Sequence, residues 1–199
     1  MRQTKKRKEI TSMPSAVLLE NEIKRRKYRT RYFQVLRNTI YTLITVAAVA
    51  VLVAVLLLPV LQIYGSSMTP TLEEGQIVIS LKGSDFKQGD VIAFYYNNKI
   101  LIKRMIAGPG SWINIDAEGN VYVDDQLLEE PYLKEGAKAF GDCNIKLPYQ
   151  VPDGRYFVLG DHRSTSIDSR NTSVGCVAEE QIVGKIVFSI WPPESIGTV

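Results

Sequence analysis

A serine and a lysine in this chain stand in contexts where they could take part in acyl transfer. Ser67 closely follows a glycine at position 65, so a turn there could expose its hydroxyl. Lys103 and Arg104 lie together inside the apolar run Ile100–Ile106, which has the pattern of a strand. Since neighbouring residues of a strand face opposite sides, one of these cations points inward if the other is solvated. A buried lysine without a carboxylate partner readily becomes neutral, and a neutral amine can accept the proton of a serine hydroxyl.

Each of these residues also has an ordinary structural interpretation. Serine-rich turns are common, and a lysine often lays its aliphatic stem along apolar surface while its ammonium reaches water. From the pattern alone, this structural interpretation of Lys103 is the commoner one. A Ser–His–Asp arrangement is disfavoured because His162 is the single histidine and lies in a polar turn. The sequence shows no obvious pair of catalytic carboxylates either.

Metal and redox chemistry find little support in the composition. The chain has two cysteines, Cys143 and Cys176, no C-x-x-C pair and one histidine, so a protein-built zinc site is not expected. No cofactor is expected. The two thiols could pair in an extracytoplasmic domain, or they could stay free, and the sequence leaves both alternatives open.

A third segment, Leu159–Arg170, is dense in polar groups. It holds the acids Asp161 and Asp168, the arginines Arg163 and Arg170, and four hydroxyls. Ion pairs among these side chains could stiffen a loop. The alternative is a solvated surface loop with weak ion pairs.

Two kinds of element must position these residues, and the first is a membrane helix. The 35 residues between Arg37 and Glu73 are uncharged, and residues 40–63 are mostly Val, Leu, Ile and Ala. A bilayer core requires about 20 apolar residues at ~1.5 Å rise each, so the stretch predicts a transmembrane helix, which we place at residues 39–63. The basic lead and the apolar run are both too long for a cleaved signal peptide.

The charge distribution predicts the orientation of this helix. Residues 1–38 carry 12 Lys/Arg and 3 Glu, a net charge of +9, whereas residues 39–199 carry 12 Lys/Arg and 18 Asp/Glu, a net charge of −6. Basic residues stay on the cytoplasmic side, so we expect a cytoplasmic tail at 1–38 and an extracytoplasmic domain at 64–199 in a single-pass protein of the cell membrane. Residues 20–37 could form a helix beside the membrane. There the basic tail indicates contact with anionic lipid headgroups rather than with nucleic acid.

The second kind of element is the strand. Beyond residue 63, short apolar runs separated by Gly and Pro replace helical periodicity, so the outer domain is expected to be mostly β. Asn97-Asn98 predicts a hairpin turn, and Glu130–Gln150 predicts a long loop with little regular structure. Strands are expected at Gln76–Leu81, Asp90–Tyr96, Ile100–Ile106, Trp112–Ile115, Asn120–Val123, Arg155–Leu159 and Ile182–Trp191.

Four motifs follow the start of the apolar stretch in order: S-M-x-P-T-L at Ser67–Leu72, G-D before a hydrophobic run at Gly89–Phe94, K-R with G-x-P-G at Lys103–Gly110, and G-D-x-R…S-x-D-S-R at Gly160–Arg170. Together they resemble the type I (leader) signal peptidases of peptidase family S26. These are membrane-anchored Ser–Lys endopeptidases with an antiparallel β catalytic domain. The resemblance runs from the membrane helix to about Pro192. The short chain and single membrane helix are similar to members from Gram-positive bacteria.

The resemblance implies a role for each site residue. Ser67 would attack the scissile carbonyl, Lys103 would take and return its proton, and the hydroxyl of Ser166 would orient the lysine. The backbone N–H of Ser67 would bind the oxyanion. Some members add a serine hydroxyl at the place of Gly65, so here a backbone group or water would have to serve. Structural roles in the catalytic loop are implied for Asp161, Arg163, Asp168 and Arg170.

The resemblance also implies the substrate. The partners would be signal peptides of exported preproteins, cut after small residues in an Ala-x-Ala pattern and bound as an added strand. Partner proteins stay unknown. Large apolar side chains beside the catalytic pair would exclude large substrate residues, and the implied pocket is formed by Ile63, Met68, Leu72, Leu101 and Ile102.

Two other functions are compatible with parts of the sequence. One is an inactive, membrane-tethered relative that binds exported chains without cutting them, which the intact Ser67–Lys103 pair disfavours. The other is a self-cleaving Ser–Lys regulator on a related β scaffold. Such regulators are soluble and cytosolic, and the apolar stretch disfavours that reading.

Overall fold

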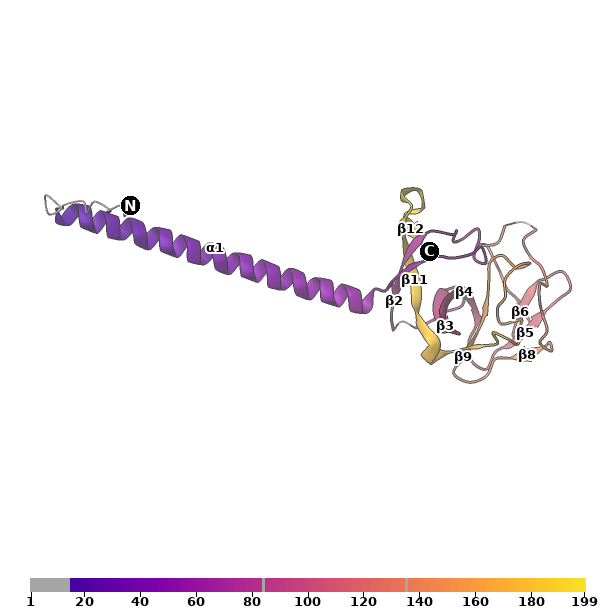
Figure 1. The fold of residues 1–199 in the computed structure, drawn as a ribbon. Helices are drawn as coiled ribbons and strands as arrows, with labels where there is room; N and C mark the ends of the chain where they lie inside the picture. Colours follow the sequence, from indigo (N-terminus) through magenta and orange to yellow (C-terminus); the bar gives the residue numbers. More distant parts are fainter. Residues whose placement is uncertain (1–14, 84, 135) are drawn as a thin grey trace, which may run out of the picture. The chain divides into compact units, whose positions relative to one another are not determined.

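The computed structural model describes residues 15–83, 85–134 and 136–199. The chain divides into two units, Met1–Val53 and Ala54–Val199, and all the strands lie in the second unit (Figure 1). The first 14 residues of the predicted basic tail lie outside the described part. The predicted domain boundary at residue 64 stays a prediction.

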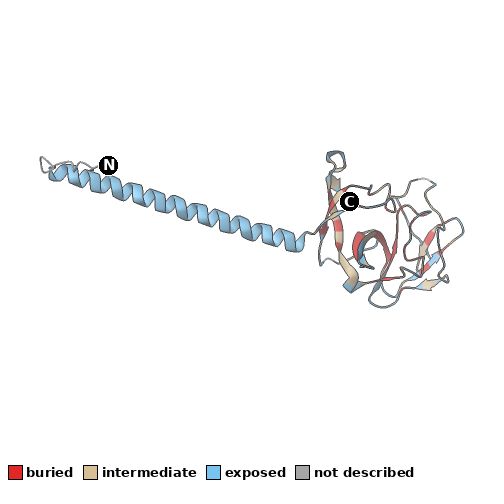
Figure 2. Cartoon of the chain, in the orientation of Figure 1, coloured by how far each residue is buried: buried red, intermediate tan, exposed pale blue. Residues whose placement is uncertain are grey.

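Helix α1 (Ala16–Leu57) is 42 residues long and is apolar enough to cross a membrane. None of its residues is buried, and Figure 2 shows it exposed along its whole length. At ~1.5 Å per residue it measures about 63 Å, roughly twice a hydrocarbon core of ~30 Å. Its N-terminal half therefore continues the predicted membrane helix into the basic segment 20–37 as one helix.

The predicted span 39–63 extends past the outer end of the helix. The helix ends at Leu57, six residues before the predicted limit, and Val60–Gln62 form strand β1 instead. Pro59 explains the end, because proline lacks an N–H and disfavours a helical conformation in the residue before it. The uncharged helical part is then residues 38–57, whose 20 residues rise about 30 Å.

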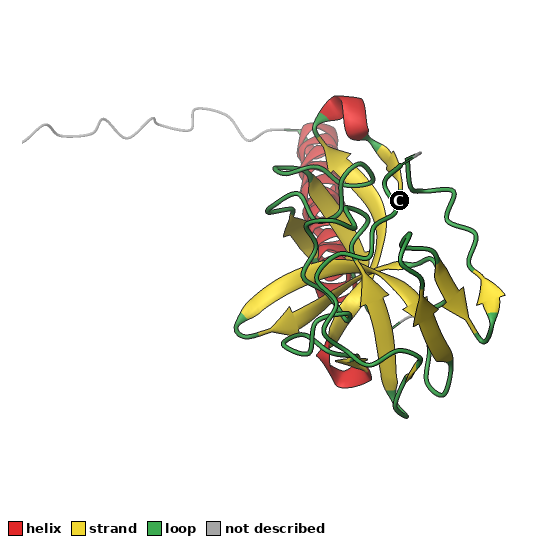
Figure 3. Cartoon of the chain, turned by 90° about the vertical axis from the view of Figure 1, so that its right-hand side faces the viewer, coloured by secondary structure: helices red, strands yellow, loops and turns green. Residues whose placement is uncertain are grey.

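The larger sheet has eight antiparallel strands in the order β1-β2-β11-β3-β4-β9-β10, with β12 paired to β11. Figure 3 shows the strands, in yellow, joined by long loops. A register irregularity occurs in β4 between Met105 and Ala107, where it pairs with β9. The strands are β1 (Val60–Gln62), β2 (Ile77–Leu81), β3 (Val91–Tyr96), β4 (Lys99–Ala107), β9 (Arg155–Leu159), β10 (Val177–Ala178), β11 (Ile182–Trp191) and β12 (Gly197–Thr198).

The smaller sheet has four antiparallel strands in the order β7-β6-β5-β8. Its strands are β5 (Trp112–Ile115), β6 (Val121–Val123), β7 (Gln126–Leu127) and β8 (Tyr149–Gln150). Two short 3-10 helices, η1 (Glu179–Gln181) and η2 (Pro193–Ser195), flank β11. A mostly antiparallel β domain behind one apolar helix confirms the predicted fold class.

All seven predicted strands are present, with ends shifted by one residue at most. The predicted hairpin joins β3 to β4, and Asn97 and Asn98 have φ values of 44° and 61°, as a two-residue turn of this kind requires. Of the described residues in 130–150, those in β8 are the ones that form a strand, which agrees with the predicted long loop.

Strand β4 joins the three clusters of buried hydrophobic residues that form the core. Ile106 lies within the cluster built on β5 and β9, Ile102 packs against the cluster that includes Met68, and Leu101 packs against the cluster of Ile92 and Phe94. Each fully buried side chain of this size contributes about 1.5–3 kcal/mol. A strand held on both faces can present its polar residues in fixed positions.

Candidate active site

The two adjacent cations of β4 are both buried. Lys103 is 3% exposed and Arg104 is 7% exposed. They face opposite sides of the sheet, as the register with Ile92 and Val91 of β3 shows. Neither cation is solvated, so both faces of β4 are covered at this point. Both faces are covered because the polar loops of the predicted motifs pack over the strand.

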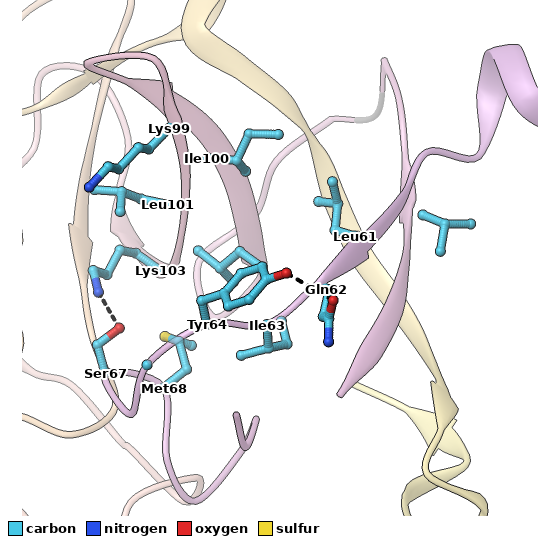
Figure 4. A pocket seen from close by; sticks show the side chains of 13 residues that line it. Leu61, Gln62, Ile63, Tyr64, Ser67, Met68, Lys99, Ile100, Leu101 and Lys103 are labelled. Carbon is cyan, nitrogen blue, oxygen red and sulfur yellow. Dashed lines mark hydrogen bonds between the residues drawn. The ribbon is translucent and has the colours of Figure 1, made fainter. Parts of the chain in front are cut away.

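Lys103 meets Ser67 on its face of the strand. The distance between Lys103 Nζ and Ser67 Oγ is 2.5 Å, and the two side chains point toward each other in Figure 4. The turn that carries Ser67 is fixed at two places. Met68 is 2% exposed in the core, and the carbonyl oxygen of Ser67 accepts a 3.1 Å hydrogen bond from the N–H of His162.

The end of β9 makes room for this turn. Strand β9 pairs with β4 only from Arg104 onward, where Arg104 lies opposite Leu159. The chain then leaves the sheet at Gly160. A Cβ atom there would lie 2.5 Å from the carbonyl oxygen of Ser67, so glycine allows the two loops to approach. The edge of β4 beside Lys103 is consequently free of a β9 partner.

Burial determines the protonation of Lys103. Desolvation lowers its pKa from 10.5 to about 8, although the charges of Asp168 and Asp161 raise it and that of Arg170 lowers it slightly further. Among the described residues, no carboxylate lies within ion-pair distance of Lys103. An amine with this pKa has a substantial neutral fraction near pH 8 and can exchange protons with a hydroxyl.

On the other face of β4, the charge of Arg104 is paired with that of Asp161. Its Nε and Nη2 donate to the two oxygens of Asp161 at 2.9 and 2.7 Å, and its Nη1 donates to the carbonyl oxygen of Gly89 at 2.6 Å. Thr71, four residues after the nucleophile candidate, donates to Asp161 at 2.5 Å. Two bonds from one guanidinium to one carboxylate form a fork, which holds both side chains in place as well as pairing their charges.

The predicted loop residues form a second buried network. Asp161, Arg163, Asp168 and Arg170 are each at most 1% exposed, so the alternative of a solvated loop is wrong. Asp168 accepts two 2.8 Å bonds from Arg170 and a 3.0 Å bond from the N–H of Gly160. Arg170 also donates to the carbonyl oxygens of Arg163, Ala139 and Phe140. The loop is thus tied to the end of β9 and to the segment around residue 140.

Ser166 is buried but does not hold the lysine. It is 1% exposed and packs against Gly160, yet its Oγ has no hydrogen-bond partner among the described residues. The backbone N–H of Ser67 donates no hydrogen bond among the described residues, so it is free to bind an oxyanion. A Cβ atom built on Gly65 meets open space, with φ at +80°, so no second donor is fixed at that position.

A cavity of about 730 Å³ opens beside the pair (Figure 4). Of the predicted pocket residues, Ile63, Met68, Leu101 and Ile102 line it, together with both members of the Ser67–Lys103 pair. Leu72 does not line it and is instead buried in the core beside Met68. The sequence missed the other lining residues, which come from β1, its following turn and the start of β4: Val60, Leu61, Gln62, Tyr64, Gly65, Lys99 and Ile100.

The remaining candidate groups lie elsewhere. Nδ1 of His162 is 3.2 Å from Thr69 Oγ1 and takes no part in the pair. Cys143 and Cys176 are both free. Within the described residues, no group of three His, Cys, Asp or Glu side chains could hold a metal ion.

Two further residues near the site, the buried Glu130 and the half-buried Tyr132, were not predicted. Glu130 pairs with Arg163, and the ring of Tyr132 lies under the guanidinium of Arg104. Both come from the segment predicted as a loop. Nothing in the local sequence signals them, because a buried carboxylate looks like any exposed one until its partner is known.

The chain matches the family model described as signal peptidase, peptidase S26, over residues 36–191. It is 30% identical to signal peptidase I of Bacillus licheniformis over 171 residues, covering 78% of this chain and 91% of the relative. It is 37% identical to signal peptidase IB of Staphylococcus aureus over 148 residues, covering 65% and 76%. A crystal structure of a signal peptidase I from Enterococcus faecalis V583 is 28% identical, covers 51% of this chain and 97% of its own, and has a TM-score of 0.42. The chain therefore belongs to the signal peptidase family S26 and is a peptidase.

Proposed function

We propose that this peptidase removes signal peptides from exported preproteins by a Ser–Lys mechanism, with Ser67 as nucleophile and Lys103 as general base. The observation that carries the proposal is the 2.5 Å distance between Ser67 Oγ and a buried Lys103 amine whose pKa is lowered to about 8. A nucleophile within hydrogen-bond reach of a base that can be neutral is the arrangement that covalent catalysis requires.

The acylation step follows from this geometry. Neutral Lys103 accepts the hydroxyl proton of Ser67 while Oγ attacks the scissile carbonyl carbon. The negative charge that develops on the carbonyl oxygen is met by the free N–H of Ser67. Collapse of the tetrahedral intermediate breaks the peptide C–N bond, and the Lys103 ammonium gives its proton to the leaving amine. The signal peptide is then esterified to Ser67.

Deacylation repeats the proton transfers with water. Neutral Lys103 removes a proton from a water molecule that attacks the ester, and the ammonium returns that proton to Ser67 Oγ as the ester breaks. The signal peptide leaves with a free carboxylate, and the enzyme regains its starting state.

The cavity supports a preference for small residues before the cut, as in Ala-x-Ala. The apolar side chains of Ile63, Met68, Leu101 and Ile102 line its wall, so they occupy space that a large substrate side chain would need. The edge of β4 before Arg104 has no β9 partner and can pair with an extended peptide. Strand addition there would bring a scissile bond beside Ser67.

The charge distribution supports an extracytoplasmic site. The basic residues of the helical segment 20–37 precede the uncharged residues 38–57, so the N-terminus would remain in the cytoplasm and contact anionic lipid. Ser67 follows the end of α1 by ten residues. The cut site of a membrane-inserted signal peptide emerges at the same surface.

Cleavage of a preprotein by the full-length chain in lipid vesicles tests the chemistry. Ser67→Ala and Lys103→Ala should each abolish product formation while the tryptophan fluorescence of the folded domain is retained. Ser66→Ala is the matched control, since Ser66 is the adjacent exposed serine and is not among the residues that line the cavity. Near-normal cleavage by either dyad variant would refute the mechanism. Binding without any product from the wild type would point to an inactive tethered relative.

Protease added to whole cells tests the orientation. Residues 64–199 should be digested from outside, while the tail stays protected until the membrane is opened. Protection of residues 64–199 in intact cells would contradict the proposed orientation.

A further inference from the structure

Glu130 is a buried carboxylate that lies outside the motifs of the candidate site. Its side chain is 0% exposed, and it follows β7 of the smaller sheet. Its Oε1 accepts hydrogen bonds from Nη2 of Arg163 and from the hydroxyl of Tyr132, the latter at 3.0 Å. Its Oε2 lies 3.8 Å from Nζ of Lys138. Glu130 therefore joins the smaller sheet to the loop that follows β9.

Tyr132 extends this connection to β4. Its ring centroid lies 3.9 Å from Cζ of Arg104, a stacking distance for a guanidinium on an aromatic face. Arg104 in turn holds Asp161 in a two-point fork, and Asp161 accepts a bond from Thr71. The chain of contacts thus runs from Glu130 to the strand of Lys103 and to the turn of Ser67.

We propose that Glu130 and Tyr132 position the Ser67–Lys103 pair, acting through Arg163 and Arg104. The proposal rests on the Ser–Lys mechanism stated above. Arg104 is the neighbour of Lys103 in β4. Arg163 is the neighbour of His162, whose N–H holds the carbonyl oxygen of Ser67. Glu130 is thereby connected both to the strand that carries Lys103 and to the loop that holds the Ser67 turn.

The energetics favour a positioning role over one in stability alone. A buried ion pair is often no more stabilising than apolar side chains of the same volume, because both charges lose their hydration. A displacement of about 1 Å at a reacting pair can cost on the order of 10² in rate. Contacts that fix two loops around a 2.5 Å approach therefore matter more to the rate than to the free energy of unfolding.

Two substitutions and their matched controls test the proposal in the full-length protein. Glu130→Gln removes the charge that holds Arg163, and Tyr132→Leu removes the ring under Arg104. Asp116→Asn and Tyr122→Leu are the controls, because Tyr122 of β6 donates at 3.3 Å to Asp116, which directly follows β5, and neither residue bonds to Arg104 or Arg163 among the described residues. Preprotein cleavage gives kcat and KM, and tryptophan fluorescence gives Tm, at a temperature where each variant is folded.

We expect Glu130→Gln and Tyr132→Leu to lower kcat by about 10–100-fold with KM within ~2-fold, since positioning affects the reacting atoms rather than binding. Tyr132→Phe should restore kcat to within ~3-fold of wild type, because it keeps the ring on Arg104. The controls should lower Tm without lowering kcat. If Glu130→Gln does not fold, the Tyr132→Leu and Tyr132→Phe pair carries the test.

Three results would overturn the proposal. These are an unchanged kcat, a loss of kcat equal to that of the controls at the same loss of Tm, or a rise in KM alone. The Ser67→Ala variant separates this failure from failure of the mechanism itself. Cleavage by Ser67→Ala, or none by the wild type, would refute the Ser–Lys mechanism and with it the positioning role.

Discussion

Lys103 and Arg104 are neighbours on one strand, are both buried, and differ in what faces them. Arg104 meets the carboxylate of Asp161 at 2.7 Å, whereas Lys103 meets the hydroxyl of Ser67. A cation that is buried with a carboxylate keeps its charge and fixes the structure. A cation that is buried against a neutral hydroxyl loses much of its preference for the charged form. In the proposed mechanism, the partner of each buried cation, and not its burial alone, separates the structural Arg104 from the reactive Lys103.

The residue types suit the two environments. Arg104 uses its planar fork, which cannot be deprotonated in a protein, to bind both oxygens of Asp161. Lys103 is a point charge on a flexible stem, and its proton can leave. The two side chains should therefore not be interchangeable.

The largest expected difference is in the rate of cleavage. Lys103→Arg keeps the charge but cannot accept the proton of Ser67, so kcat should fall by about 10²–10⁴-fold at every pH. Arg104→Lys keeps a charge opposite Asp161 but loses the two-point fork, the bond to Gly89 and the flat stack on Tyr132, so kcat should fall by about 10–100-fold, as for Tyr132→Leu. Steady-state cleavage by the full-length variants measures both. Substantial activity in Lys103→Arg would mean that Lys103 is not the base.

The next difference is in stability, and its sign should be opposite at the two positions. Arg104→Met leaves Asp161 buried and unpaired, which costs about 3–5 kcal/mol. Lys103→Met removes a cation whose folded pKa of about 8 lies below its unfolded value of 10.5. A lowered pKa in the folded state destabilises the fold at every pH at which the unfolded chain binds this proton more tightly than the folded chain does and the amine is protonated in the unfolded chain. The penalty is complete below pH 8 and disappears above pH 10.5.

At pH 7 we therefore expect Lys103→Met to raise Tm and Arg104→Met to lower it, by about 2–4 °C per kcal/mol. Both tryptophans, Trp112 and Trp191, lie in the β-rich unit, so their fluorescence reports its unfolding. The higher Tm of Lys103→Met relative to the wild type should vanish as the pH rises past 10.5. A lower Tm for Lys103→Met at pH 7 would show that the buried amine is not destabilising.

A smaller effect should appear in the pH dependence of cleavage. In the proposed mechanism neutral Lys103 is the active form, so kcat/KM should rise about tenfold per pH unit below pH 8 and level off above it. Asp161 raises the pKa of Lys103, so Asp161→Asn should move this rise to lower pH. Asp116→Asn, which removes a carboxylate just after β5 that is not among the charges acting on Lys103, should leave the position of the rise unchanged. A shift of the Asp161→Asn profile to higher pH would contradict the assignment of the base.

The sequence predicted the features that depend on local patterns, namely most of the strands and the identity of the candidate site residues. The seven predicted strands have apolar residues and turn residues at their ends, and the motifs around Ser67 and Lys103 indicate the proposed dyad. The strands that were missed are β1, β7, β8, β10 and β12, which are two or three residues long and exist because a partner strand pairs with them. Strand β1 was also hidden inside the apolar stretch, which continues past the end of the helix at Leu57.

The contacts that decide the chemistry were less accessible from the sequence. The alternation of a strand predicts opposite faces for Lys103 and Arg104 but not what covers each face. Ser67, which lies 36 residues before Lys103 in the sequence, covers one face. Asp161, which lies 57 residues after Arg104, covers the other. Tertiary packing also left the Ser166 hydroxyl without a protein partner in the described part of the chain, although its motif implied contact with the lysine.

The smallest effect is expected at Lys99, the third cation of β4 and the exposed one. Lys99 lines the outer part of the cavity four residues before Lys103, where water reaches its ammonium. An exposed charge contributes at most about 1 kcal/mol to an interaction, so Lys99→Gln should change KM by less than ~5-fold and leave kcat unaltered. At ~1 M salt the Debye length falls to about 3 Å, so the difference in KM should disappear. A loss of kcat in Lys99→Gln would show that a solvated cation on this strand also acts in catalysis, and burial would then not be required for a reactive lysine.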